Sequence, residues 1–256
     1  MSRPFDFTGR RVFVTGSTLG IGRAAAEAFH ACGARVAISG RTPESVARAI
    51  HEMGGGPHFI AVPGDLSVAS ERRRAISHVL AELGGLDVLV NNAGRGDDCL
   101  IDDVTEEYWQ RMLDLNAKAV FFTSQMCVPE LKKSRGNIIN VASVLGLIGG
   151  PAGSVVYATT KGAVVQMTRM MALALAPEGI RVNALCPGWI DTPMIQRENA
   201  AAGNDGLYKY IAGVVPLGRI GTPRETIGAM LYLAAPSSSY TTGAILSADG
   251  GLTAGH

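Results

Sequence analysis

Short apolar runs alternate with helix-like segments along almost the whole chain, and this alternation restricts the fold more than any other feature. Seven runs rich in β-branched and aromatic residues are predicted strands: 12–15, 35–39, 58–62, 87–91, 137–141, 180–185 and 244–247. Apolar strands that alternate with helices are typical of a parallel sheet covered on both faces. We therefore expect a doubly wound, Rossmann-type α/β fold, a three-layer sandwich with a seven-stranded parallel sheet, formed by residues 1–256 as a single domain.

Helical periodicity is found between the predicted strands, at 20–32, 44–53, 67–83, 105–133, 154–176 and 223–233. Ser67 and Ser154 are expected to cap the N-termini of their helices, and the long segment 105–133 is expected to be interrupted. One apolar stripe on segment 154–176 is predicted to pack on the core: Met167, Met170, Met171 and Leu175.

Charge and cysteine content narrow the classes of partner. The formal net charge is +1 with no long run of one sign, so no nucleic acid or anionic membrane is expected as a partner. No segment has the length and apolarity of a signal sequence or a membrane span, which favours a cytoplasmic protein. The four cysteines are scattered without Cys-x-x-Cys spacing and are expected to be reduced core thiols, with no metal site: Cys32, Cys99, Cys127 and Cys186.

A glycine-rich turn follows the first predicted strand and precedes a helix. Glycines there let backbone N–H groups approach a diphosphate, and the helix points its positive end at that charge. The spacing Gly-x-x-x-Gly-x-Gly departs from the usual dinucleotide fingerprint, so a purely structural turn is the alternative. The candidate cofactor contacts in this turn are Gly16, Ser17, Thr18, Leu19, Gly20, Ile21 and Gly22.

Tyr157 and Lys161 lie four residues apart in a helical segment and should share one helix face. An ammonium beside a phenol favours the phenolate and should lower the pKa of the phenol toward working pH. Such a pair could exchange a proton with an alcohol or a ketone. Considered alone, the spacing equally fits an ordinary surface pair.

Five motifs in order give a specific resemblance. They are Thr15-Gly-x-x-x-Gly-Ile-Gly22, Asn91-Asn-Ala-Gly94, Ser143, Tyr157-x-x-x-Lys161 and Pro187-Gly188. From residue 8 to residue 252 the chain resembles the short-chain dehydrogenase/reductase family, in its single-domain branch. The resemblance implies an oxidoreductase that transfers a hydride between a nicotinamide dinucleotide and a secondary alcohol or ketone.

The resemblance also implies roles for individual residues. Tyr157 would be the general acid for reduction and the base for oxidation, while Lys161 would lower its pKa and hold the nicotinamide ribose. Ser143 would hydrogen-bond the substrate oxygen, and Asn116 would support a water that links Lys161 to solvent. Taken alone, Ser143 also fits a turn and Asn116 a helix-interior polar residue. Further cofactor contacts implied by the family are Asp65, Leu66, Asn92, Ala93, Gly94, Pro187, Gly188, Ile190 and Thr192.

The end of the second strand bears on the choice of cofactor. NAD-binding proteins carry a carboxylate there for the adenosine ribose, whereas an arginine suits a 2′-phosphate. Here the sequence is Ser39-Gly-Arg41-Thr42, so NADP(H) is favoured over NAD(H), with Ser39, Arg41 and Thr42 as contacts. The alternative is that Arg41 is a solvated surface residue and that Glu44 or another group serves NAD.

Substrate choice is expected in segment 145–153 and in a substrate lid at about 192–215, although that long segment could also be a variable surface insertion. The sequence most resembles 3-oxoacyl carrier-protein reductases and sugar or polyol dehydrogenases, so the substrate is a 3-oxoacyl thioester, a sugar or polyol, or a small ketone. Lys132, Lys133 and Arg135 could face an acidic carrier protein, although Glu178 stands where such reductases often carry a base.

The family suggests a homotetramer with segments 105–133 and 154–176 and the end at 249–252 in its interfaces. The competing function is a catalytically silent dinucleotide-binding regulator on the same fold.

Overall fold

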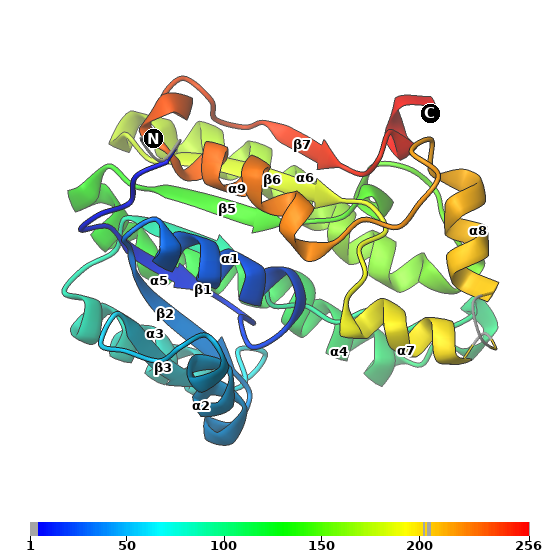
Figure 1. Cartoon of the computed structure of the whole chain (residues 1–256), viewed down its shortest axis with the longest axis horizontal. Helices are drawn as coiled ribbons and strands as arrows, with labels where there is room; N and C mark the ends of the chain where they lie inside the picture. The colour runs from blue at the N-terminus through cyan, green and yellow to red at the C-terminus, as the bar shows by residue number, and fades with distance from the viewer. Residues whose placement is uncertain (1–4, 202, 204–205, 256) are drawn as a thin grey trace.

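A seven-stranded parallel sheet runs through the computed structural model, which describes residues 5–201, 203 and 206–255. The strands follow the spatial order β3-β2-β1-β4-β5-β6-β7 (Figure 1). Their bounds are β1 (Arg11–Val14), β2 (Arg35–Gly40), β3 (Phe59–Pro63), β4 (Val88–Asn91), β5 (Asn137–Val141), β6 (Arg181–Pro187) and β7 (Ile245–Ala248). The predicted Rossmann-type α/β fold is confirmed.

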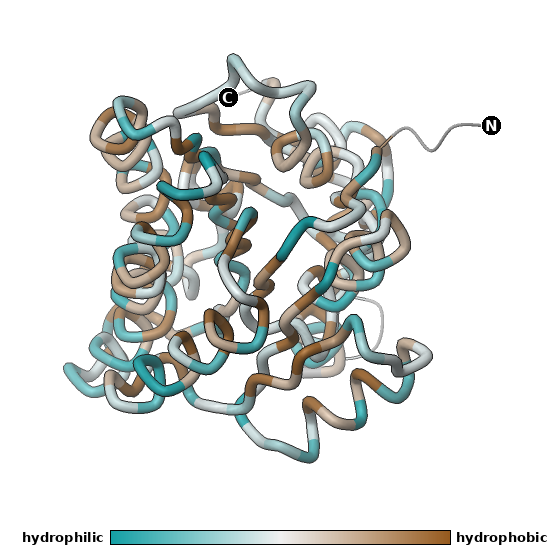
Figure 2. Tube along the Cα trace, turned by 90° about the vertical axis from the view of Figure 1, so that its left-hand side faces the viewer, coloured by the Kyte–Doolittle hydropathy of each residue, from teal (hydrophilic) through white to brown (hydrophobic). Residues whose placement is uncertain are grey.

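Helices cover both faces of this sheet, because successive strand residues point to opposite sides. Val12 and Val14 of β1 pack with helices α1 (Gly20–Ala31) and α9 (Ile227–Ala234). Phe13, between them, packs on the other side with α3 (Ala69–Leu83) and α5 (Ala119–Ser134). Figure 2 shows the result as hydrophobic segments gathered inside the molecule and hydrophilic ones on the outer helix turns.

The remaining helices are α2 (Pro43–Glu52), α4 (Glu106–Leu113), α6 (Val155–Leu175), α7 (Pro193–Ala201) and α8 (Gly206–Val214). Between α4 and α5 the chain forms a π-helical turn at Asp114–Lys118, which is the interruption expected in that long segment. Such turns often occur at functional sites. Within residues 192–215, α7 and α8 replace the expected open loop, and residues 202, 204 and 205 of that range lie outside the described residues.

Two expected helix caps are wrong. Helix α3 begins at Ala69 with Val68 before it, and the Ser67 hydroxyl donates instead to Asp65 Oδ1 at 2.6 Å. Ser154 precedes α6, but its hydroxyl donates to Asp98 Oδ1 at 3.1 Å and caps no backbone N–H. In both cases the hydroxyl donates to a nearby carboxylate and accepts no bond from a backbone N–H of the first helical turn.

The predicted stripe on α6 is partly wrong. Met167, Met171 and Leu175 pack against the core, but Met170 is 56% exposed. One residue advances about 100° around a helix, so Met170 faces away when Met171 faces inward. Leu173 is also exposed, at 72%. Helix α6 therefore presents apolar side chains on its outer face.

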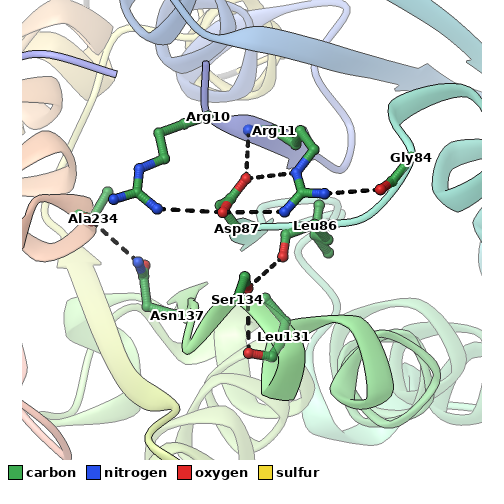
Figure 3. Close-up of polar contacts among 9 residues, drawn as sticks. All are labelled: Arg10, Arg11, Gly84, Leu86, Asp87, Leu131, Ser134, Asn137 and Ala234. Atoms are coloured by element: carbon green, nitrogen blue, oxygen red, sulfur yellow. Dashed lines mark hydrogen bonds and ion pairs between the residues drawn. The ribbon is translucent and has the colours of Figure 1, made fainter. Parts of the chain in front are cut away.

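A charged cluster lies at the amino ends of the central strands β1 and β4 (Figure 3). Asp87, buried just before β4, accepts hydrogen bonds from Arg11 N and Nε at 2.9 and 2.8 Å, and Arg10 Nη1 lies 3.3 Å from its other oxygen. Burial by itself raises the pKa of the Asp87 carboxyl, but the hydrogen bonds and charge of Arg11, with the charge of Arg10, lower it below the usual 3.8. This cluster joins β1 to the start of β4.

Two of the four expected core cysteines are buried. These are Cys127 and Cys186, whereas Cys32 and Cys99 are only partly buried. Lys132 forms an ion pair with Glu178 at 2.8 Å. Across the described ranges of the chain, no helix has the length and apolarity needed to cross a bilayer.

Candidate active site

A cleft of about 680 Å³ opens at the carboxyl ends of the strands. Residues that follow β1, β2, β3, β4, β5 and β6 all line it, together with the start of α7. Open parallel sheets bind ligands at this edge. Helices α7 and α8 lie beyond the arrowheads of β5, β6 and β7 in Figure 1.

The glycine turn after β1 is fixed against the loop after β4. A Cβ on Gly16, which has φ +61°, would lie 2.8 Å from Ala93 Cα, so only glycine fits without a shift. The Thr15 hydroxyl accepts hydrogen bonds from the backbone N–H groups of Asn92 and Ala93, both at 2.9 Å. Asn92 Nδ2 donates in return to the Thr15 carbonyl at 2.9 Å. The floor of the cleft is therefore shaped by side-chain to backbone bonds between two strand ends.

Most of the residues predicted as cofactor contacts or catalytic groups lie on the wall of this one cleft. They are Gly16, Thr18, Leu19, Gly20, Ile21, Ser39, Arg41, Asp65, Leu66, Asn92, Ala93, Gly94, Ser143, Tyr157, Lys161, Pro187, Gly188, Ile190 and Thr192.

Three predicted contacts instead shape the cleft from behind. The fully buried Ser17 hydroxyl donates to the Val14 carbonyl at 2.7 Å and accepts from Ser39 N at 2.9 Å. Gly22 lets the Asn92 side chain approach, since a Cβ there would lie 2.3 Å from Asn92 Nδ2. Thr42 caps α2 by accepting from Ser45 N. None of the three is among the residues that line the cleft.

Ser143, Tyr157 and Lys161 meet at one end of the cleft. Ser143 follows β5, and Tyr157 and Lys161 share one face of α6, as predicted. Gly146 brings the Ser143 segment against α6, because a Cβ there would lie 2.7 Å from the Lys161 carbonyl carbon. Lys161 Nζ donates to the Val141 carbonyl at 2.9 Å and lies 5.7 Å from the centre of the Tyr157 ring.

The acidity of this pair differs from the sequence-based expectation. Burial raises the pKa of the Tyr157 phenol to about 12, and interaction with the Ser143 side chain offsets only part of this. Burial lowers the pKa of Lys161 to about 8. The pKa of the phenol is therefore raised in this structure, where the sequence predicted a lowering, because desolvation by burial is the largest effect. The phenol holds its proton at neutral pH, the state needed to protonate a reduced carbonyl oxygen.

Asn116 lies in the π-helical turn and is fully buried. Its side chain accepts from Arg95 N at 2.9 Å and donates to the Arg95 carbonyl at 2.8 Å, so both ends bind one backbone unit. A Cβ on Gly94 would lie 3.3 Å from Asn116 Oδ1 and 3.5 Å from Lys161 Nζ. Asn116 is outside the cleft wall and fixes the loop after β4 beside Lys161.

The far end of the cleft is formed by the residues after β2. A Cβ on Gly40 would lie 2.5 Å from Thr18 Cγ2, so a larger side chain at this position would require the Thr18 side chain to move. Arg41 is exposed on the cleft wall and forms no hydrogen bond or ion pair within the described residues. Glu44, the alternative contact, is exposed and does not line the cleft. Among the described residues, the Arg41 guanidinium is thus an unpaired positive charge at this end, on the same wall as the Asp65 carboxylate after β3.

Sequence reasoning missed several residues of the cleft wall. Gly96, Asp97 and Asp98 follow β4, and Glu198 lies on α7 within the expected lid without having been singled out. The rule that residues after each strand form the site could have found the first three, since Arg95 to Asp98 continues directly from the Asn91 motif. Lys132, Lys133, Arg135 and Glu178 are not part of the wall.

The family is established by comparison with known proteins. A family model described as Enoyl-(Acyl carrier protein) reductase matches residues 16–253. The chain belongs to the short-chain dehydrogenase/reductase family, whose members are oxidoreductases that act on CH–OH and C=O groups and bind a nicotinamide dinucleotide.

Individual relatives cover nearly the whole chain. The 3-oxoacyl-(acyl-carrier-protein) reductase FabG of Thermotoga maritima is 38% identical, across 95% of this chain and 98% of its own length. The L-fucose dehydrogenase of Mus musculus is 36% identical, across 98% and 90%. The crystal structure of a short-chain type dehydrogenase/reductase from Mycobacterium marinum superimposes with a TM-score of 0.90 at 35% identity, covering 97% of both chains.

Proposed function

We propose that this protein reduces ketones, or oxidises the corresponding secondary alcohols, with NADP(H) as the hydride donor or acceptor. The observation that carries the proposal is the placement of the Ser143 hydroxyl and the Tyr157 phenol at one end of a cleft whose other walls are a glycine turn and a helix N-terminus. When bound there, the nicotinamide supplies or accepts the hydride.

The chain's own residues handle the oxygen and its proton. Negative charge develops on a carbonyl oxygen as its carbon is reduced, and hydroxyl donors from Ser143 and Tyr157 stabilise that charge. The phenol then gives its proton to this oxygen. Because the pKa of the phenol is raised to about 12, the transfer requires a strongly basic, alkoxide-like oxygen. Lys161, bonded to the Val141 carbonyl, is assigned to hold the cofactor ribose and to support the phenolate.

NADP(H) is favoured by the groups after β2. Arg41 is the exposed guanidinium beside the glycine turn, and Gly40 supplies no carboxylate to accept from an adenosine ribose. Asp65 and Leu66 on the same wall are assigned to the adenine side.

Assembly as a homotetramer is supported by exposed apolar side chains on the helices expected at interfaces. On α4, α5 and α6 these are Trp109, Phe121, Phe122, Met170 and Leu173. A patch of this kind on a soluble protein usually marks a surface covered by a partner, here other copies of the chain.

A carbonyl panel with both cofactors tests the function. Short 3-oxoacyl thioesters, ketoses and small ketones are each incubated with NADPH or NADH, and cofactor oxidation is followed. The proposal expects turnover of at least one class with a clear preference for NADPH. A clear preference for NADH contradicts the cofactor assignment, and no oxidation across the panel favours the silent regulator.

A further inference from the structure

Three segments that are distant in sequence meet beside the catalytic tyrosine. A Cβ on Gly96 would lie 2.8 Å from Met194 Sδ and 3.6 Å from Tyr157 Cε2. The loop after β4, helix α7 and helix α6 therefore touch one another at the end of the cleft where a substrate carbonyl must lie.

Three carboxylates line this end: Asp97, Asp98 and Glu198. Asp97 is bound by the guanidinium of Arg95, and Asp98 Oδ1 accepts from the Ser154 hydroxyl at 3.1 Å. Glu198 differs from both, because no hydrogen bond or ion pair joins it to any of the described residues.

Glu198 is directed toward the reacting groups. Met194 and Glu198 are four residues apart on α7, so they lie on the same side of the helix, and Met194 is the residue in contact with Gly96. The charge of Glu198 is also felt at the Tyr157 phenol, where it adds to the effect of burial in raising the pKa.

The surroundings of Glu198 are themselves unfavourable to negative charge. Burial is the main cause that raises the pKa of its carboxyl to about 7; the charges of Asp98 and Asp97 act in the same direction, and the charge of Arg197 acts against them. A second anion brought to this position would meet the same desolvation and the same carboxylates.

We propose that Glu198 is a specificity residue that accepts a hydrogen bond from a hydroxyl group of a neutral substrate and disfavours substrates that carry a carboxylate near the reacting carbonyl. This inference rests on the proposed function of the same cleft. The favoured substrate class is therefore the hydroxyketone or sugar type, with a hydroxyl two or three bonds from the carbon that receives the hydride.

The expected preference depends on which substrate group lies beside Glu198: a hydroxyl can donate a hydrogen bond to it, and an ionised carboxylate cannot. Above about pH 8, the condition chosen for the test below, Glu198 with its pKa of about 7 is mostly ionised. An ionised carboxylate only accepts hydrogen bonds, so a hydroxyl satisfies it and a second carboxylate cannot. Like charges at close approach in a partly desolvated site repel each other, which gives discrimination without any attractive contact.

Two ketones of equal chain length test the inference in assays above about pH 8, where Glu198 is mostly ionised. Acetoacetate and 4-hydroxybutan-2-one differ only in a terminal carboxylate against a terminal hydroxymethyl group. We expect the wild-type protein to reduce the hydroxyketone with the higher kcat/KM. Glu198→Gln keeps an oxygen acceptor but removes the charge, so kcat/KM should rise by about tenfold or more for acetoacetate and change by less than about threefold for the hydroxyketone.

Further variants separate specificity from damage to the fold. A rise in activity toward acetoacetate cannot come from misfolding. Glu198→Ala should raise KM for the hydroxyketone, because the acceptor is lost, while Glu198→Gln restores it. Glu82→Gln, at an exposed residue on α3 outside the cleft, should leave both values unchanged.

The outcomes are distinct. A wild-type preference for acetoacetate, or a ratio that Glu198→Gln leaves unchanged, overturns the inference while the oxidoreductase assignment stands. Failure of the wild-type protein to oxidise NADPH with either ketone or with any member of the wider carbonyl panel overturns both.

Discussion

Replacing Arg41 with alanine should separate the two nicotinamide cofactors. Arg41 is the exposed guanidinium beside the glycine turn, and no described residue pairs with it, so its charge is available to a 2′-phosphate. A hydrogen bond to a charged group contributes about 1.5–3 kcal/mol, and solvent exposure at this site reduces that to about 1–2 kcal/mol. The dissociation constant for NADPH should therefore rise about 5- to 30-fold.

The measurement is a titration of both cofactors into the wild-type protein, Arg41→Ala and a matched control. Arg48, exposed on α2 and outside the cleft, provides the control variant Arg48→Ala. NADH has no 2′-phosphate, so its dissociation constant should change by less than about twofold in either variant. An equal loss of affinity for NADH and NADPH, or no loss for NADPH, would refute the assignment of Arg41.

Two further predictions concern stability and assembly. Asp87→Asn should lower the free energy of unfolding by about 2 kcal/mol in denaturant titrations, because the charged partner of Arg11 is lost. Glu27→Gln, which breaks a more exposed, half-buried pair with Arg23, should cost less than about 0.5 kcal/mol. The folded-state pKa of Asp87 is below its usual 3.8, so this contribution is present above about pH 4 and is lost as the pH falls through the folded value; a wild-type advantage that does not decrease as the pH is lowered below about 4 would contradict it. Leu173→Asp should reduce the molar mass measured by light scattering below that of a tetramer, while Ala47→Asp, exposed on α2, should not; a wild-type monomer would sink the assembly proposal.

The strand pattern predicted the fold because buried parallel strands have a strong signal. Both faces of β4 and β5 are covered, so their sequences are mainly apolar, with the buried Asn140 as an exception in β5, and the segment 137–141 matches β5 at both ends. Helix ends were predicted less well. Ser67 and Ser154 have the residue type of a cap, but each hydroxyl binds a carboxylate instead: Asp65, two residues before Ser67, and Asp98, which is distant from Ser154 in the sequence.

The site was predicted through motifs that follow strand ends, and its limits are of two kinds. Sequence alone does not separate a residue that lines the cleft from one that shapes it. Ser17, Ser39, Asn116 and Lys161 are all buried, but only Ser39 and Lys161 line the cleft. The acidity of Tyr157 depends on how deeply the phenol is buried and on its interaction with Ser143, which are properties of the three-dimensional structure. Glu198 has no motif, and only the placement of α7 brings it near Tyr157.

The central claim is that Tyr157 exchanges the proton in an NADP(H)-dependent carbonyl reduction. The most direct measurement compares Tyr157→Phe with the wild-type protein in turnover of the best panel substrate and in the dissociation constant for NADPH. Loss of the phenolic proton should lower kcat by about 10²- to 10⁴-fold, since that is the usual contribution of general acid catalysis, with NADPH affinity nearly unchanged. Turnover that survives the substitution would contradict the claim.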